Sequence, residues 1–133
     1  MDLVQVGTVH TPYARVADCP RWPWTQSVIS TLRIDATYVG CVEGVRAGIR
    51  AHVLWWAALA DRSVTRRHMA AAGPLTGVMA SRGVARPNPI GLTLVDVVAV
   101  AADGLSIEVR GMDCVTGSPL LDIKPALTLP TYQ

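Results

Sequence analysis

The sequence of 133 residues predicts an all-β protein, a small single-domain β-barrel without a Rossmann unit and with one or two short helices. Eighteen Val and six Ile stand against only two Glu and one Lys. β-Branched residues favour strands, and poverty in Glu and Lys disfavours exposed helices. Pro and Gly separate several short apolar runs, which is typical of a closed or nearly closed barrel. A chain of this length builds one hydrophobic core, so residues 1–133 are expected to form one domain.

The first three predicted strands differ in how clearly their pattern shows. Residues 3–10 and 28–35 alternate between two sets of positions, which is the period of a half-buried strand. Residues 49–59 form a longer apolar run, whose length leaves strand or helix open. The adjacent Trp55 and Trp56 favour a strand that is buried on both faces.

The clearest hairpin lies in the second half of the chain. Residues 92–101 and 105–110 are rich in β-branched and apolar residues, and Asp103-Gly104 lies between them. This dipeptide supplies the positive φ angles that a tight hairpin turn needs. Residues 120–123 are expected to form a last short strand before a proline.

Residues 62–86 combine one predicted helix with concentrated positive charge. The Ala-rich residues 65–73 are expected to form a helix that ends at Gly73-Pro74. The stretch from 62 to 86 holds five Arg and one His, without Asp or Glu. It is either a solvated loop that shares the chain's preference for Arg over Lys, or a surface that contacts phosphates, as on a protein that holds RNA.

Composition excludes several classes of protein. Hydrophobic residues make up 50% of the chain and charged residues 17%, which excludes a disordered tail. The net charge of +2 neither requires nor excludes a nucleic-acid partner. The N-terminus lacks the pattern of a secretory signal, and no stretch approaches the roughly 20 apolar residues of a membrane helix. The protein is therefore expected to be cytoplasmic, without a membrane partner.

The cysteines and histidines point to no metal site. Three Cys and three His are far apart and form no CxxC or zinc-type spacing. We expect Cys19, Cys41 and Cys114 to be reduced, because free thiols are the rule in a cytosolic protein. The histidines are expected to be structural or exposed rather than metal ligands.

Three segments have unusual compositions, and each allows a functional and a structural interpretation. In residues 81–92, two prolines flank Asn88, so the loop is either pre-ordered for a ligand or a rigid barrel corner with solvated Arg. In residues 110–125, an acid lies near the only Lys, as a catalytic or ligand-orienting pair or as a surface ion pair worth about 0–1 kcal/mol. In residues 20–24, two Trp form either a platform for a flat ring such as adenine or a cap on the barrel end.

In this order along the chain, these segments resemble the TsaA-like family, also called the TrmO-type methyltransferases. Residues 86–92 read RPNPIGL and residues 121–125 read LDIKP, as in the family's two long motifs. VGTVHTPY at residues 6–13 is similar to the family's IGxIxSPY. PRW at residues 20–22 and AHVL at residues 51–54 are similar to PRQ and SHLW. The similarity covers nearly the whole chain.

The resemblance implies a small β-barrel, usually paired as a homodimer with its site near the subunit interface, that binds S-adenosylmethionine (SAM) without a Rossmann domain. The best-known family activity is N6-methylation of threonylcarbamoyl-adenosine beside the anticodon of a tRNA, so tRNA is the implied acceptor. The positions that match the family's cofactor contacts are Pro23, Trp24, Thr25, Ala60, Asp61, Arg82, Leu92, Arg110, Gly111, Met112 and Asp113.

The resemblance also suggests roles for charged residues in methyl transfer. The Asp113 carboxylate would suit a cationic methyl donor, and Arg82 would suit the donor's carboxylate through a bidentate contact. If the acceptor nitrogen must lose a proton, Asp122 is the nearest candidate base, with Lys124 orienting it. The expected acceptor contacts are Arg82, Arg86, Asn88 and Lys124.

Departures from the family pattern keep other functions open. Ala60, Thr116 and Ala126 stand where the family usually carries His, Asp and Tyr. The sequence also ends soon after LDIKP, so we expect it to lack the additional C-terminal region of longer bacterial tRNA enzymes. The alternatives are a methyltransferase for a small metabolite and a catalytically inactive SAM-binding barrel.

Overall fold

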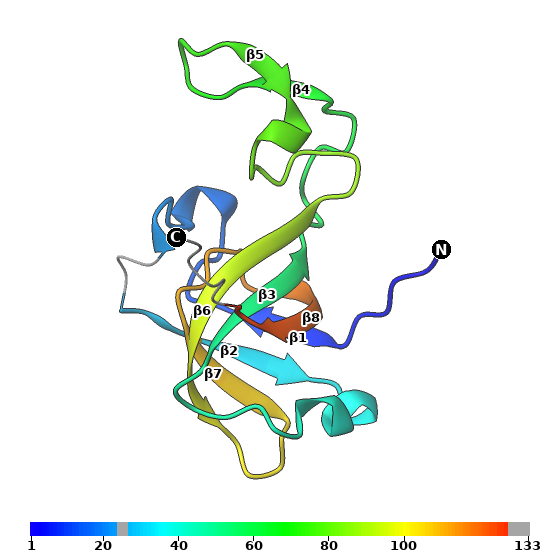
Figure 1. Ribbon diagram of the computed structural model, residues 1–133, viewed down its shortest axis with the longest axis vertical. Coiled ribbons are helices and arrows are strands. Elements are labelled where there is room, and N and C mark those ends of the chain that lie inside the picture. The colour runs from blue at the N-terminus through cyan, green and yellow to red at the C-terminus, as the bar shows by residue number, and fades with distance from the viewer. Residues whose placement is uncertain (24–26, 128–133) are drawn as a thin grey trace, which may run out of the picture.

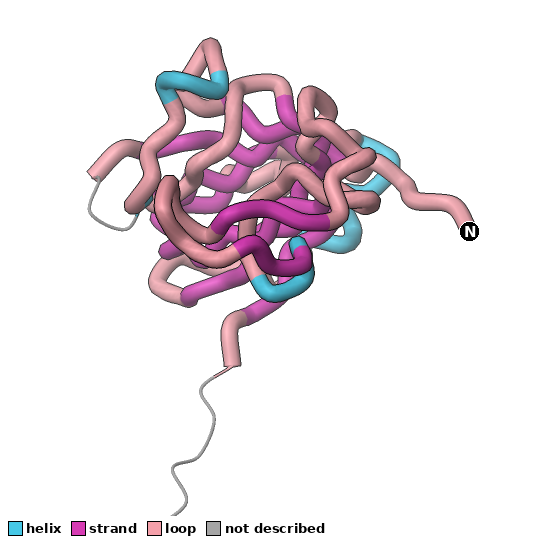
Figure 2. The backbone as a smooth tube through the Cα atoms, turned by 90° about the horizontal axis from the view of Figure 1, so that it is seen from above, coloured by secondary structure: helices cyan, strands magenta, loops and turns pink. Residues whose placement is uncertain are grey.

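Within residues 1–23 and 27–127, which the structure describes, six antiparallel strands form a closed barrel, as the sequence predicts (Figure 1). The structure is a computed structural model. The strands are β1 (Gly7–His10), β2 (Ile29–Ile34), β3 (Arg50–Trp56), β6 (Ile90–Val100), β7 (Ser106–Arg110) and β8 (Ser118–Pro125). Around the barrel they follow the order β1-β2-β7-β6-β3-β8. Figure 2 shows the same strands from above, beneath the connecting loops.

Alternate residues of each strand fill the barrel interior. In β6, every second residue from Gly91 to Val97 is buried, and the residues between them face outward. Each fully buried apolar side chain contributes roughly 1.5–3 kcal/mol to folding, so this interior is the main source of stability. The largest fully buried side chains of the strands are Leu32, Ile107, Leu120, Val9, Val53 and Val109.

Strands β6 and β7 form the predicted hairpin. Val100 pairs with Ile107, and the turn follows directly. Gly104 has a φ angle of 73°, and the Asp103 carboxylate accepts a hydrogen bond from Leu105 N at 3.0 Å. Both turn residues therefore act as their types predict, and the hairpin prediction is confirmed.

Two other predicted strands differ from their sequence patterns. One is shorter than predicted, and the other is buried on one face only. Of residues 3–10, only Gly7–His10 form a strand of the barrel. Strand β3 is confirmed as a strand, but it is not buried on both faces. The Trp55 side chain points inward and is buried, whereas Trp56 is only half-buried on the outer face. Because β3 is part of a barrel wall, one of its faces meets the core.

The predicted helix at residues 65–73 is wrong. Arg66–His68 instead form β4, which pairs antiparallel with β5 (Leu75–Gly77) in a two-stranded sheet outside the barrel. The chain turns back between these strands, and Gly73 and Pro74 lie in that turn. The Ala-rich composition has local helical propensity, but the pairing partner of β4 comes only after Pro74, so tertiary pairing overrides propensity.

The helical segments that the structure describes are short 3-10 helices in the connections between strands. They are η1 (Val16–Asp18), η3 (Ala36–Val42) and η4 (Val78–Ala80). Among the described residues, we find no helix with the length and apolar character needed to cross a lipid bilayer.

Residues 62–89, here called the arm, extend from one end of the barrel and contain β4, β5 and η4 (Figure 1). Arg86 braces the base of the arm. Its guanidinium donates hydrogen bonds to the carbonyls of Val78, Ser81 and Gly83 at 2.9, 3.0 and 2.8 Å. One planar fork thus holds three backbone carbonyls of η4 and the loop that follows it, which a lysine cannot match.

Arg62 forms a second brace between the two chain segments that join the arm to the barrel. Its Nε donates to the Pro87 carbonyl at 2.8 Å, and its guanidinium carbon lies 5.1 Å from the Trp56 ring centroid. Beside it, Ala57 N donates to the Pro89 carbonyl at 2.8 Å. The RPNPIGL loop is therefore ordered by hydrogen bonds as well as by its prolines.

Gly91→Ala tests the close contact between β6 and the Trp55 indole. A Cβ at Gly91 would overlap the indole ring, which lies opposite Gly91 in the β3–β6 register. Because the ring is buried, we expect the substitution to lower the free energy of unfolding by about 1–3 kcal/mol. Gly40→Ala is the control, since nothing lies within 4 Å of the position of its Cβ. Urea unfolding measures both variants, and equal stability of the two would contradict the contact.

Candidate functional site

A pocket of about 470 Å³ lies at the end of the barrel from which the arm extends. It is enclosed by the segment around η1, the inner face and the end of β3, the loop after η4, and the residues between β7 and β8. Its lining includes Cys19, Trp55, Ala60, Arg82, Asp113 and Pro119. Most of the wall is apolar, so the Asp113 carboxylate is the ionisable acid that this pocket offers a ligand.

A chain of two hydrogen bonds ends at that carboxylate. Trp55 Nε1 donates to Thr93 Oγ1 at 3.0 Å, and Thr93 Oγ1 donates to Asp113 Oδ1 at 2.6 Å. An indole N–H can only donate, so the threonine hydroxyl accepts from Trp55 and must give its own hydrogen to Asp113. Trp55 and Thr93 are 7% and 4% exposed, which places both bonds in a low-dielectric interior. The chain fixes one carboxylate oxygen of Asp113 at the pocket wall.

Opposing effects act on the pKa of Asp113. Burial raises the pKa of Asp113, while the hydrogen bond from Thr93 and the charge of Arg82 lower it. Within the part of the chain that the structure describes, no cation touches the Asp113 carboxylate, so part of the free-energy cost of burying its ionised form is not offset. A ligand with a positive charge in this pocket would favour the ionised form and would itself be stabilised.

Arg82 supplies charge of the opposite sign at the pocket rim. Its side chain is exposed and lines the pocket, and its Nη2 donates to the carbonyl of Leu92 at 3.1 Å. This bond anchors the guanidinium beside β6 while other N–H groups face solvent. A carboxylate of a ligand could accept from them in the planar geometry that Arg favours.

Two cysteines in the pocket wall are poor nucleophiles at neutral pH. Burial raises the pKa of Cys114 to about 12, and burial also raises the pKa of Cys19. A thiol must ionise to act as a nucleophile, so neither is prepared for nucleophilic attack at neutral pH. Both are free thiols, as expected from the sequence.

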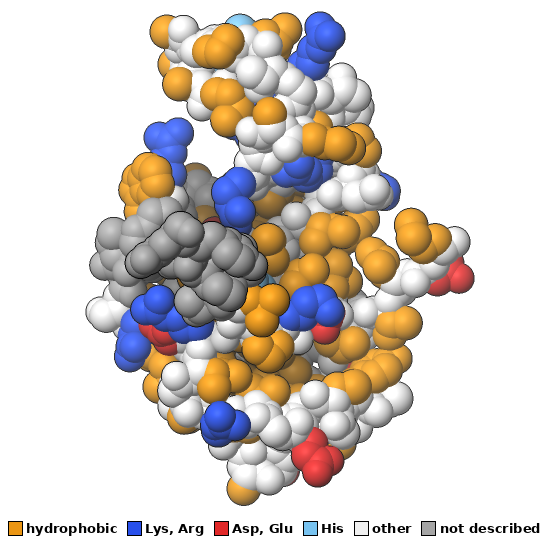
Figure 3. All heavy atoms as spheres, in the orientation of Figure 1, with side chains coloured by type: hydrophobic (Ala, Val, Ile, Leu, Met, Phe, Trp, Pro, Cys, Tyr) orange, Lys and Arg blue, Asp and Glu red, His pale blue; other side chains and the backbone are white. Residues whose placement is uncertain are grey.

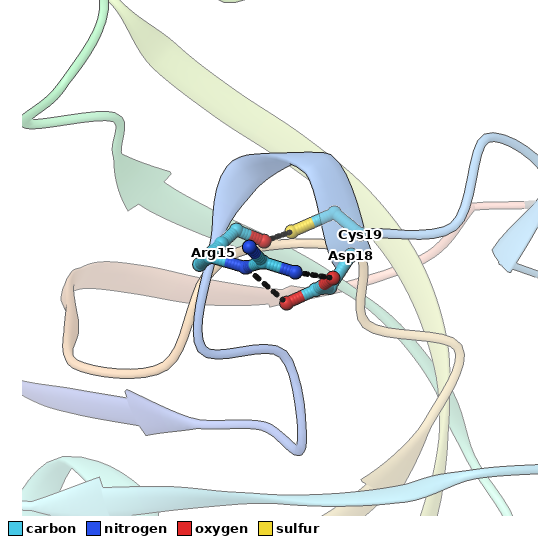
Figure 4. Close-up of polar contacts among 3 residues, drawn as sticks. All are labelled: Arg15, Asp18 and Cys19. Atoms are coloured by element: carbon cyan, nitrogen blue, oxygen red, sulfur yellow. Dashed lines mark hydrogen bonds and ion pairs between the residues drawn. The ribbon is translucent and has the colours of Figure 1, made fainter.

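The turn around η1 contains Cys19, which lines the pocket. Figure 4 shows its contacts with Arg15 and those between Arg15 and Asp18. The Arg15 guanidinium pairs with the Asp18 carboxylate, with both nitrogen–oxygen distances at 3.3 Å. The Cys19 thiol donates a weak hydrogen bond to the Arg15 carbonyl at 3.6 Å. The ion pair is exposed, so it contributes about 0–1 kcal/mol and mainly favours the geometry of this short turn.

The structure brings three of the predicted cofactor residues together in the pocket, namely Ala60, Arg82 and Asp113. Asp61, the next residue after Ala60, accepts hydrogen bonds from Ser63 N and Ser63 Oγ at 2.9 and 2.6 Å. These bonds also hold the pKa of Asp61 below its usual value. The Leu92 side chain faces outward from β6, and its backbone reaches the site only through its bond with Arg82.

The other predicted cofactor residues do not line the pocket or cannot be placed. Arg110 is the exposed last residue of β7, and Gly111 turns the chain with a φ angle of 111°. Met112 is 3% exposed and belongs to the hydrophobic core. Pro23 is buried but is not part of the pocket wall. Trp24 and Thr25 lie outside the described residues.

The predicted acceptor contacts of the arm have different environments. Arg86 uses its guanidinium as the brace described above, so its observed contacts are structural. Asn88 is exposed beside the buried Pro89, and its carbonyl accepts a hydrogen bond from Ile90 N at 2.7 Å. Of the arm residues predicted from the resemblance, Arg82 therefore has the most direct access to the pocket.

Asp122 and Lys124, the predicted catalytic pair, lie away from the pocket. They form an ion pair with a distance of 3.2 Å between Lys124 Nζ and Asp122 Oδ2, and their side chains are 66% and 49% exposed. In the β3–β8 register they lie opposite Leu54 and His52, farther along the barrel than Ser118 and Pro119, which line the pocket. Within one chain the pair is not next to the pocket, and its catalytic role stays a prediction.

Sequence reasoning missed Trp55 and Thr93 as site residues. A signal for Thr93 was available, because in β6 it shares the inward face with Gly91 and Val95. A hydroxyl at a buried strand position must find a partner, which points to a polar group inside the barrel. The partner itself, Asp113, follows β7 and comes next to Thr93 through the antiparallel pairing of β6 with β7, in which Asp96 lies opposite Arg110.

The match to a described protein family covers most of the chain. Residues 8–129 match the tRNA-methyltransferase O N-terminal domain. The chain is 38% identical over 124 residues to the probable S-adenosyl-L-methionine-binding protein VirR of Rhizobium radiobacter, covering 93% of this chain and 70% of that protein. It is 37% identical over 120 residues to a probable S-adenosyl-L-methionine-binding protein of Methanothermobacter thermautotrophicus, covering 90% of this chain and 85% of that protein.

Longer proteins are also similar. The tRNA (adenine(37)-N6)-methyltransferase of Escherichia coli is 30% identical over 137 residues, covering 92% of this chain and 56% of that protein. A crystal structure of TrmO superposes with a TM-score of 0.78 at 24% identity, covering 96% of this chain and 57% of that chain. At that identity the likeness concerns the fold. The chain thus spans a little over half the length of these two proteins.

Thr93→Val tests the hydrogen-bond chain. The substitution keeps the side-chain shape but removes the hydroxyl that lowers the pKa of Asp113, so we expect the pKa of Asp113 to rise further above its usual value. Thr93→Ser keeps the hydroxyl and should leave this pKa near that of the unsubstituted protein. Carbon-13 NMR titration of the Asp113 carboxyl group measures both variants. The same midpoint in Thr93→Val as in the unsubstituted protein would contradict the chain.

Proposed function

We propose, since the chain belongs to the tRNA-methyltransferase O N-terminal domain family, that it is a SAM-dependent methyltransferase acting on an adenosine of tRNA. The single observation that carries the cofactor assignment is the pocket with Asp113 inside and Arg82 at its rim. The tRNA acceptor is supported by the tRNA (adenine(37)-N6)-methyltransferase of Escherichia coli, to which this chain is similar.

The residues of the pocket fit SAM. A volume of about 470 Å³ lies within the roughly 300–1,000 Å³ usual for small-molecule sites. The apolar wall suits the adenine and ribose faces, and Asp113 offers a partly buried anion to a cationic ligand whose own charge would compensate it. Arg82 offers N–H donors to the carboxylate of the cofactor's amino-acid part.

Catalysis by such a site rests on alignment more than on acid–base chemistry. The cofactor supplies an electrophilic methyl group. The protein's contribution is to hold donor and acceptor in line and to exclude water, which can account for a large part of a rate enhancement. Asp113 is suited to this because its Oδ1 is fixed by Thr93, so the carboxylate does not need to reorient when the ligand binds.

The finer assignment is N6-methylation of threonylcarbamoyl-adenosine beside the anticodon. Its support is the resemblance of the RPNPIGL and LDIKP segments to the TrmO-type family, together with the relative that acts on adenine 37 of tRNA. A tRNA acceptor would also place the protein in the cytoplasm. Arg82, Asn88 and Lys124 remain the proposed acceptor contacts.

We also propose a homodimer that covers the outer face of β3 and β6. Leu92 and Leu94 are 44% and 48% exposed on this face, and Leu54 lies opposite Leu92 in the register. Asp122 and Lys124 lie on the neighbouring strand β8, opposite Leu54 and His52 of β3. A second copy on this face would bury the apolar stripe and would bring Asp122 from one subunit toward the pocket of the other, where it could accept the acceptor's proton.

A second candidate is a SAM-binding protein without transfer to RNA. The observation that favours it is that VirR and the Methanothermobacter relative, which this chain matches over most of their length, carry SAM-binding names rather than methyltransferase names. Ala60, Thr116 and Ala126, which depart from the family pattern, also leave room for a small-molecule methyl acceptor.

Transfer of labelled methyl groups decides between these candidates. We expect label from SAM to enter tRNA that carries threonylcarbamoyl-adenosine without its methyl group, and nucleoside digestion to release the N6-methylated form. A tRNA transcript without that modified nucleoside is the control and should stay unlabelled. SAM binding by calorimetry without label in any RNA would contradict the tRNA activity and support the second candidate.

Asp113→Asn tests the pocket directly. Loss of the carboxylate removes a charge-assisted contact to the cationic ligand, so SAM should bind about 10-fold to 100-fold more weakly. Asp103→Asn is the matched control, because Asp103 lies in the β6–β7 turn and asparagine suits that position. Calorimetric titration of SAM measures both. Equal weakening in the two variants would contradict the assignment of Asp113.

Leu94→Glu tests the proposed dimer. A carboxylate on the outer face of β6 would lose its hydration when the apolar face of Leu92 and Leu54 is covered, so we expect the variant to be a monomer in sedimentation equilibrium. Val4→Glu is the control, because Val4 is similarly exposed at 52% but lies in the N-terminal segment before β1. A dimer that persists in Leu94→Glu would contradict this interface.

A further inference from the structure

The arm carries a concentration of positive charge without acidic residues. Residues 62–89 contain five Arg and one His but no Asp or Glu. Among the described residues, the ion pairs are Arg15–Asp18, Arg50–Asp96 and Lys124–Asp122, and none involves an arm residue. In Figure 3, the visible face of the arm shows basic and apolar side chains and no acidic ones. The arm is therefore a local positive field on a protein of net charge +2.

The sheet of the arm presents its cations to solvent. Arg66, Arg67 and His68 are consecutive exposed residues of β4. Because side chains alternate along a strand, Arg66 and His68 share one face and Arg67 lies on the other. A Cβ at Gly83 would overlap the Arg67 guanidinium, so this cation lies directly against the loop that forms the pocket wall. The charged surface thus continues from β4 to the rim of the pocket at Arg82.

The position of this surface is fixed relative to the pocket. Arg86 ties η4 to the loop that follows it, and Arg62 joins the two segments that connect the arm to the barrel. Val78 N also donates to the Thr65 carbonyl at 3.0 Å, which links η4 to the start of β4. A ligand held on β4 would therefore be held at a defined place relative to Arg82.

We propose that Arg66 and Arg67 of the arm bind the phosphate backbone of the RNA acceptor and hold it while one nucleoside enters the pocket. This inference rests on the proposed function and assigns its RNA-positioning surface. Contacts to phosphates fix the orientation of an RNA without reading its sequence, which suits exposed guanidinium groups on a short protruding sheet. Arg is favoured for phosphate because its planar fork matches two oxygens.

Charge also favours RNA over a second copy of this chain as the occupant of the arm. Two arms brought together would place like charges side by side, which costs several kcal/mol at an interface. The arm also exposes three apolar side chains, those of Met69, Leu75 and Met79. These side chains are compatible with RNA or with a second copy of the chain, so the positive charge is what favours RNA. An acid-free surface gains from a polyanion, since each phosphate contact releases counterions.

The test is tRNA binding by filter retention over a series of salt concentrations, without methyl transfer. Arg66→Gln/Arg67→Gln removes two cations from β4. We expect binding of bulk tRNA to weaken about tenfold, and the slope of log affinity against log salt to fall by about 1 for each lost contact. Arg66→Lys/Arg67→Lys keeps the charge and should retain most of the binding. SAM affinity should change much less than tRNA affinity in both variants, because neither residue lines the pocket itself.

Arg33→Gln/Arg46→Gln is the matched control. Arg33 is on β2 and Arg46 lies between η3 and β3, away from the arm, and both are exposed. The same loss of charge there should change the affinity and the salt slope much less. Equal losses in the two double variants, or no loss in Arg66→Gln/Arg67→Gln, would overturn the inference. A change of Arg66→Gln/Arg67→Gln from dimer to monomer in sedimentation would also overturn it, in favour of a second copy.

The binding readout separates this inference from the proposed activity. If the unsubstituted protein binds tRNA through β4 but transfers no methyl group, the inference stands and the activity fails. If the protein methylates tRNA and the arm variants bind and react like the unsubstituted protein, the activity stands and the inference fails.

Discussion

The hydrogen-bond chain from Trp55 through Thr93 to Asp113 is the interaction on which the site depends. It joins β3, β6 and the segment after β7, which are distant in sequence, at one end of the barrel. The chain requires the indole to lie against Gly91, where any larger residue would overlap it. Its result is a carboxylate that is fixed in position and whose pKa is raised by burial, an environment that suits a ligand of positive charge.

The sequence predicted the parts of the fold that local patterns determine. The barrel class, the β6–β7 hairpin and its Asp103-Gly104 turn follow from strand periodicity and turn chemistry. The helix at residues 65–73 was wrong, because the partner of β4 comes after the turn and local composition does not reveal it. Asp113 and Arg82 were found through motif resemblance. Trp55 and Thr93 were missed, since their roles arise only when β6 pairs with β3 on one side and with β7 on the other.

The five arginines of the arm have different environments, which the sequence alone does not reveal. Arg86 and Arg62 direct their guanidinium groups at backbone carbonyls and hold the arm and its loop in place. Arg66, Arg67 and Arg82 are exposed; Arg67 lies against Gly83 beside the pocket rim, and Arg66 lies on the other face of β4. All five of these arginines belong to the same 28-residue arm, so composition alone does not show which of them hold the backbone in place.

The most direct test of the account is the response of the Trp55 indole to ligand. Nitrogen-15 NMR can follow its Nε1–H signal, assigned with Trp55→Phe, during titration with the demethylated product of SAM. We expect this signal and the backbone amide signal of Asp113 to shift in a saturable manner, since both residues line the pocket. Shifts confined to the polar groove of about 480 Å³ at Gly7 and Arg33, with Trp55 unchanged, would contradict it.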